Sequence, residues 1–461
     1  MKRRVLVVTA LVLAITGQAA TAGGDGTNIR GMGMGRTFVA SSRGLDAAGV
    51  NPANLAFDDG NTVSVGLLPL GATVGSNFMS YGLYSKYFTG VQTDSGRVGR
   101  YLGDQDKQEI LDAFPDGLGN LLGHAEVRPF GIAVRAGDLG TAAFTITEQF
   151  HGNFQIPREY VRFLLYGNTP GSSLDFRGTR GGAEWTREYA LSYAREIPSL
   201  FIFEQLAVGA TVKVIHGFAR VDVPRFNSVL QTGADGTLDG RLDAVTRVSR
   251  IDALEGGDFD PFPAPAGTGL GFDLGVSGIV GEFLTVGVSI TDIGSLRWTR
   301  NIEESVADGI IHLDDVTNEA QRDSVEHAVN GETRPGAAFS STLPTMIRAG
   351  ASVDLHKIKV IRRFLLGELT AAADFHKCIE PAPGVATTLR FSTGIEYRPI
   401  RAIHVRMGLT AGGLEGTAFA MGLGVRVGFF ELDIASGNLW WMFNPDALSQ
   451  GSLAVGMRLV F

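Results

Sequence analysis

The sequence predicts an all-β protein, a transmembrane antiparallel β-barrel of about fourteen strands. Three observations lead to this fold class. Apolar residues alternate with small or charged ones in many short segments. The connections between these segments are alternately short and long, and the chain ends in an aromatic residue, Phe461.

The first 22 residues have the pattern of a secretory signal peptide. Residues 2–4 are basic, residues 5–15 are apolar, and Ala20-Thr21-Ala22 fits a cleavage site of small residues. The apolar stretch is shorter than the roughly 20 residues that a spanning helix needs. The net charge of −8 disfavours a nucleic-acid partner. The lone Cys378 excludes an internal disulfide, and we expect it to be a structural thiol.

Alternation is clearest from residue 270 to residue 291. Apolar side chains share one face of 270–277 and of 284–291, and Gly281-Glu282 between them predicts a tight hairpin. The opposite faces carry glycine, serine, threonine and one aspartate. A soluble sandwich also alternates, but its exposed face normally carries longer polar side chains. An apolar outer face with small and polar residues inside is typical of a membrane barrel.

The same pattern along the chain gives the predicted strands. They cover residues 62–88, 127–136, 140–150, 186–195, 206–218, 270–280, 284–296, 345–355, 363–376, 388–397, 402–411, 418–427, 430–440 and 452–461. Alternate connections of a meander lie at the same rim, so the short turns gather at one rim and the long loops at the other. Outer-membrane barrels have this asymmetry. The terminal Phe461 resembles their assembly signal and implies the barrel-assembly machinery as a partner.

The segment GMGRTFVASSRGLDAAGVNPANL resembles the N-terminal pattern of the FadL/OmpP1 superfamily of outer-membrane proteins. The matching residues are Gly33, Gly35, Arg36, Asp46, Ala47, Asn51, Pro52 and Ala53. The resemblance implies an N-terminal plug, or hatch, inside a fourteen-stranded barrel, whereas a disordered tail is the alternative. The chain then divides into a signal peptide (1–22), a plug (23–60) and a barrel with long external loops (61–461). Later segments resemble an uncharacterised branch of such barrels.

The resemblance also implies a function and a location. It predicts a barrel in the outer membrane of a double-membraned bacterium, in contact with outer-membrane lipid. There it would mediate porin-like, passive uptake of hydrophobic small molecules such as long-chain fatty acids. The family releases ligand by plug rearrangement or sideways through a kinked third strand, yet residues 140–150 carry no proline or bulge signature.

Two alternatives remain open at the level of the sequence. PorV-like relatives act as carriers or scaffolds in secretion or envelope assemblies, and the acidic loop 301–332 is a candidate docking site for a protein partner. A soluble secreted β-protein is the other alternative.

Charged residues at inward positions are the candidate lumen residues. They are Lys213, Asp273, Arg390, Glu396, Arg406, Arg426 and Arg458, with Arg348, Asp354, Glu368, Asp374 and Asp433 also inward by parity. They either line a selective path or stabilise the barrel as cross-strand ion pairs.

The external loops hold the other candidates. Trp440, Trp441 and Phe443 form either an aromatic girdle or a capture surface for an apolar ligand. Residues 101–114 and 157–168 predict amphipathic helices. The spaced aspartates of 233–243 lack the full calcium-loop pattern, and the motifs HExxH and GxSxG are absent from the sequence. We therefore expect no catalytic residue, no metal and no cofactor.

Overall fold

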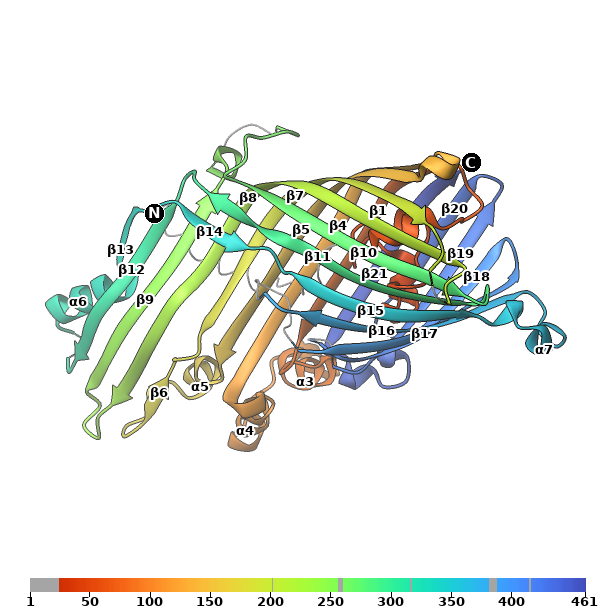
Figure 1. The fold of residues 1–461 in the computed structure, drawn as a ribbon. Coiled ribbons are helices and arrows are strands. Elements are labelled where there is room, and N and C mark those ends of the chain that lie inside the picture. Colours follow the sequence, from red (N-terminus) through yellow and green to blue (C-terminus); the bar gives the residue numbers. More distant parts are fainter. Residues whose placement is uncertain (1–24, 201, 256–259, 316, 381–387, 414–415) are drawn as a thin grey trace.

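The computed structural model describes residues 25–200, 202–255, 260–315, 317–380, 388–413 and 416–461, so the expected signal peptide lies outside the described residues. Within these ranges fourteen antiparallel strands close a barrel (Figure 1). In order around the wall they are β1 (Val63–Ser76), β4 (Leu118–Arg135), β5 (Thr141–Pro157), β7 (Arg180–Ile197), β8 (Gln205–Thr232), β10 (Gly267–Val280), β11 (Leu284–Trp298), β15 (Met346–Asp354), β16 (Glu368–Cys378), β17 (Arg390–Ile400), β18 (Ile403–Gly412), β19 (Ala418–Val427), β20 (Phe430–Ser436) and β21 (Gln450–Val460). The barrel closes where β21 pairs with β1, from Ser64↔Val460 to Gly75↔Gln450. The predicted fold class is confirmed.

The outer surface of the wall is apolar. Leu270, Phe272 and Leu274 of β10 are 54, 44 and 51% exposed, while Asp273 between them is fully buried. Because the apolar faces point outward rather than toward a second sheet, the wall suits contact with lipid. None of the described helices is long and apolar enough to cross a bilayer.

Some predicted strand ends are wrong. The first strand stops at Ser76 rather than at residue 88, since Ser80 caps a helix, α3 (Tyr81–Phe88), by accepting the N–H of Leu83. β20 stops at Ser436, where the chain turns into an external loop. β8 runs far past residue 218, to Thr232, because its outer half pairs with β9 (Leu238–Arg250) in a long hairpin.

The long loops gather at one end of the barrel and contain regular structure. Beside α3 they hold β2 (Val91–Thr93), β3 (Gly96–Val98), α4 (Asp104–Asp112), α5 (Glu159–Tyr166), β6 (Ser173–Asp175), β12 (Glu303–Leu313), α6 (Glu319–Asn330), β13 (Glu332–Pro335) and β14 (Phe339–Thr342). The acidic segment 301–332, expected as a loop, is therefore mostly strand and helix. The outer half of β8 pairs with β9, β9 with β12, and β12 with β13, which extends the wall as a protruding sheet (Figure 1). At the opposite, short-turn end lies α7 (Lys359–Arg362).

The N-terminal segment lies inside the barrel (Figure 1). Residues 25–57 are buried almost throughout and form α2 (Ile29–Gly33) and two 3-10 helices, η1 (Gly44–Ala47) and η2 (Pro52–Ala56). At the start of η2, Asn51 accepts the N–H of Ala53, and Pro52 takes the first helical position, where its missing N–H is not needed. The segment packs against strands from many parts of the wall, including β7, β8, β10, β18, β19, β20 and β21. It fills the lumen as a plug.

Candidate functional site: the plugged lumen

The loop-side end of the plug is held by a cluster of guanidinium groups around Asp25. The nearest approaches to its carboxylate are 3.0 Å from Arg390, 3.6 Å from Arg348 and 3.7 Å from Arg36. Arg348 and Arg390 project from β15 and β17, whereas Arg36 belongs to the plug. All of these side chains are buried or nearly so. Since guanidinium groups recognise carboxylates, this cluster is a carboxylate-binding site that the plug itself occupies.

Wall carboxylates also bind the backbone of the plug. Asp374 of β16 accepts the N–H of Phe38 at 2.6 Å and the N–H of Val39 at 2.8 Å. Glu126 of β4 accepts the N–H of Gly26 at 3.0 Å and the hydroxyl of Thr27 at 2.6 Å. These buried carboxylates satisfy backbone groups that have no strand ladder of their own.

A second charged cluster holds the plug nearer the short-turn end. Glu396 pairs with Arg30 of the plug at 3.0 Å and with Arg406 of β18 at 2.6 Å. Arg458 of β21 pairs with Asp46 of the plug at 3.0 Å. The plug therefore contributes one cation and one anion to this network, and each meets an opposite charge on the wall.

A potential metal site lies in this second cluster. Single ligand atoms of His404, Glu431 and Asp433 lie within 4.8 Å of one another. Arg406 pairs with Asp433, and Arg458 lies 3.4 Å from Glu431. Both carboxylates thus already have guanidinium partners, so the geometry favours an ion-pair network over a metal centre.

Lys213 forms a further cluster within the wall. Its ammonium lies 3.0 Å from Asp273 and 3.7 Å from Glu188, and it donates to Asp292. Asp292 reaches this cluster through a bulge: its φ is +61°, and the β10–β11 register shifts beside it. On the loop side, Lys213 is followed by a buried apolar cluster, defined here as Ile215, Phe218, Ile251, Ala266, Leu296, Trp298 and Leu343.

The plug motif lies where the plug backbone touches the wall. A Cβ on Gly33 would meet Gly422 at 2.9 Å, and one on Gly35 would meet the backbone of Leu409 at 2.8 Å. Gly35, which has a φ of +66°, also accepts the hydroxyl of Thr410. These glycines permit an approach that any side chain would block.

The Asn51-Pro52-Ala53 tripeptide makes the corresponding contact on β10 and β8. Asn51 donates to Ser277 at 2.9 Å and to the carbonyl of Val39 at 3.0 Å. Pro52 and Ala53 lie against Gly209 and Gly275, so no side chain separates the plug from the wall.

The structure places six of the seven candidate lumen residues inside the barrel and one at its rim. Lys213, Asp273, Arg390, Glu396, Arg406 and Arg458 lie on the inner face within the clusters described above. Arg426 instead lies half-buried at the short-turn rim, where it donates to Asn61 at 3.0 Å. Parity predicts the face of a residue but not its height, and Arg426 is close to the end of β19.

The loop aromatics surround an outward residue of the wall. The rings of Trp440 and Phe443 lie 6.1 and 6.0 Å from that of Phe419 on β19, and Trp441 is 44% exposed. This position at the edge of the apolar band favours the girdle over a capture surface. At the other rim, the ring of Phe461 stacks on that of Phe429 at 5.7 Å.

Sequence reasoning missed several residues of these clusters. Asp25 precedes the recognised motif, Arg30 lies within a glycine-rich run, and Glu126 falls just outside the predicted strand. Glu188 is inward by parity and was identifiable from the alternation. Asp292 was not, because its parity places it on the apolar face of β11.

The third strand, β5, is regular along one of its two edges. β5 pairs with β7 without a register shift from Thr141↔Ala194 to Gln155↔Arg180. Its ladder with β4 shifts register between Val127 and Phe130. The irregularity continues in the β1–β4 ladder, where no paired residues lie between Gly66↔Gly131 and Leu70↔Val127. Pro69 and Pro129 lie in this gap, and proline cannot donate to a ladder.

Comparison with family models identifies the chain at the level of its family. A model of a family of unknown function, DUF5723, matches residues 52–437. The chain belongs to this family. Among curated proteins, none matches this DUF5723 member.

Solved structures show which fold this DUF5723 member shares. A deletion mutant of the monoaromatic hydrocarbon channel TodX has 12% identity and a TM-score of 0.51, with 94% of this chain and 98% of that chain covered. A FadL homologue from Pseudomonas aeruginosa has 14% identity and a TM-score of 0.48, with 96% and 100% covered. The toluene transporter TbuX from Ralstonia pickettii has 14% identity and a TM-score of 0.45, with 95% and 99% covered. The match to the TodX mutant shows that the chain shares the FadL-like barrel fold.

Proposed function

We propose that this protein is a plugged outer-membrane channel that admits hydrophobic small molecules passively, with long-chain fatty acids as the substrate class. The observation that carries the proposal is a lumen filled by a segment that ion pairs and hydrogen bonds hold to the wall. Such contacts exchange with competing ligands, so the plug can rearrange while the barrel stays closed. The fold is shared with a hydrocarbon channel, and such neighbours are transporters rather than enzymes.

The loop-side half of the lumen supports an amphiphilic carboxylate as the substrate. Arg348 and Arg390 bind the carboxylate of Asp25, which stands where the head group of a fatty acid would bind. Arg348 also donates to Thr291 of β11, the strand that supplies Leu296 and Trp298 to the apolar cluster. A ligand with an acidic head and an apolar tail therefore matches both features, and its carboxylate would displace Asp25 and release the end of the plug.

Uptake of labelled oleate by cells that lack their own fatty-acid channel tests this proposal. Cells producing the protein should accumulate oleate faster, and Arg390→Gln should reduce that gain severalfold. Arg177→Gln, which alters an exposed pair with Asp175 in an external loop, is the matched control. Equal uptake with and without the protein, for both oleate and toluene, would reject the channel. A gain for toluene alone would keep the channel and reject the fatty-acid assignment.

A carrier or scaffold role is the second candidate, and the protruding sheet favours it. β9 and β12 extend beyond the barrel and are joined by ion pairs of Arg247 with Glu304 (3.2 Å) and of Arg250 with Glu303 (3.1 Å). Such a platform suits a protein partner at the external loops. Replacing residues 303–335 with a short linker should abolish a defined partner complex and leave oleate uptake intact if this role holds.

A further inference from the structure

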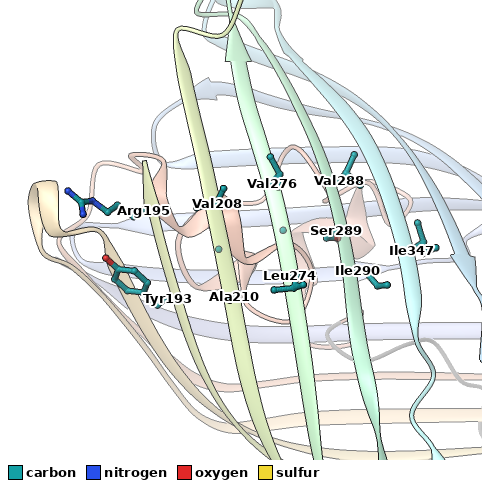
Figure 2. A pocket seen from close by; sticks show the side chains of 12 residues that line it. Tyr193, Arg195, Val208, Ala210, Leu274, Val276, Val288, Ser289, Ile290 and Ile347 are labelled. Carbon is teal, nitrogen blue, oxygen red and sulfur yellow. The ribbon is translucent and has the colours of Figure 1, made fainter. Parts of the chain in front are cut away.

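A depression of about 630 Å³ lies on the outer, lipid-facing surface of the wall, away from the plugged lumen. It spans β7, β8, β10 and β11 and reaches Ile347 of β15 (Figure 2). Its volume lies within the roughly 300–1,000 Å³ of sites that bind small organic molecules.

Strand register explains the shape of the depression. One row across the strands is Tyr193, Ala210, Leu274, Ile290 and Ile347, and the next row toward the short turns is Arg195, Val208, Val276 and Val288. Figure 2 shows the valines of the second row side by side. Ala210 lies between the larger Tyr193 and Leu274, so its small side chain forms the floor of the depression.

The plug lies directly behind the depression. Inward residues between the two rows include Gly209 and Gly275, and a Cβ on Gly209 would lie 2.4 Å from the backbone of Pro52. The strands that form the depression are thus backed by the plug on their inner face.

Arg195 supplies a cation at the short-turn edge of the depression. Its side chain is exposed on the outer face, and within the described residues its guanidinium has no ion pair or hydrogen bond. The adjacent Glu196 lies 3.8 Å from Arg135 instead. Tyr193 is fixed beside it, since its hydroxyl donates to the carbonyl of Leu139 at 2.6 Å.

We propose that this depression binds one phospholipid of the inner leaflet. Its phosphate pairs with Arg195, and an acyl chain lies over Ala210 between the apolar rows. Short turns of outer-membrane barrels face the periplasm, so Arg195 lies at the depth of the inner-leaflet head groups. An unpaired guanidinium at this depth can pair with a lipid phosphate, and the apolar rows contact the acyl chain. The proposal depends on membrane insertion but not on the proposed transport function.

Native mass spectrometry of the intact, detergent-purified protein with added dioleoyl phosphatidylglycerol tests the site. We expect one tightly retained lipid per barrel. Arg195→Gln should weaken its retention about tenfold, as loss of a hydrogen bond to a charged group predicts. Ala210→Leu should weaken it at least as much by filling the floor of the depression. Matched controls are Arg401→Gln, an exposed cation at the same rim, and Ala411→Leu, an outward alanine of β18; both should retain the lipid.

Heat-modifiable migration on a detergent gel shows that each variant still folds as a barrel. Equal lipid retention in all variants would overturn the proposal. So would a dimer of barrels that Ala210→Leu dissociates, because a second copy would then be the occupant of the depression.

Discussion

The carboxylate of Asp374 accepts the backbone N–H of Val39 at 2.8 Å, and thereby joins the middle of the barrel wall to the middle of the plug. The same oxygen accepts the N–H of Phe38 at 2.6 Å. Hydrogen bonds to a buried charged group contribute about 1.5–3 kcal/mol each. Asp374 therefore holds the plug through backbone N–H groups rather than through an ion pair with the plug.

Removing that attachment should make the plug leaky. For Asp374→Ala we expect more frequent ion-conducting openings in planar lipid bilayers than for the unchanged protein, because two backbone donors lose their acceptor. Asp374→Asn keeps one oxygen acceptor in place and should have a smaller effect. Identical conductance traces for Asp374→Ala and the unchanged protein would show that other contacts hold the plug at this height.

The Lys213 cluster should stabilise the barrel rather than the plug. Lys213→Met leaves Asp273 and Asp292 buried without their cation, and removal of one member of a buried ion pair costs about 3–5 kcal/mol. The midpoint of urea unfolding, followed by the folded band on a detergent gel, should fall clearly. Lys86→Met, which removes an exposed lysine paired with Glu109, should leave it unchanged. Equal midpoints for the two variants would contradict this assignment.

The close backbone contact between wall and plug should not tolerate a side chain added to its glycines. A Cβ on Gly408 would lie 2.2 Å from the carbonyl carbon of Met34 and 2.3 Å from the nitrogen of Gly35, and neither atom belongs to a flexible side chain. We expect Gly408→Ala to displace the plug and expose Arg30 and Arg36 to trypsin in a barrel that remains folded. Gly451→Ala is the control, since a Cβ there meets nothing within 4 Å. If trypsin spares the plug of Gly408→Ala, the contact is looser than described.

The terminal aromatic residue should act in assembly rather than through its ring contact alone. Phe461→Ala should reduce severalfold the amount of folded barrel in the outer membrane, measured by the heat-modifiable band of membrane fractions. Phe429→Ala removes the same stacked pair but keeps the chain end, so it should assemble normally if Phe461 is a recognition signal. A comparable loss in both variants would assign the effect to packing at the rim.

The alternation of side chains was sufficient to predict the wall. In β10, Leu270, Phe272 and Leu274 alternate with small residues and Asp273, and lipid on one side of a single sheet selects this pattern. Such local rules hold for each strand independently, which explains why the number of strands was predicted well. Strand ends were predicted less well, because a cap such as Ser80 or a partner such as β9 decides where a strand stops.

The charged contacts were predicted only in part. Parity predicted that Lys213 and Asp273 lie on the inner face. The same rule predicted that Asp292 lies on the outer face, but a bulge at this position turns its side chain inward. Asp25 lies more than three hundred residues from Arg348 and Arg390 in the chain, and only closure of the barrel brings them together.

The sequence by itself determined that one sheet closes on itself, which side of it meets lipid, and that a glycine-rich segment precedes it. These features follow from side-chain period and backbone freedom, which are local properties. Only the tertiary structure decided that the plug is bound by Asp374, Glu126 and the arginines around Asp25, and that the outer wall is hollow beside Arg195. Those contacts depend on register and on the height of each residue in the barrel, and neither is encoded within a single strand.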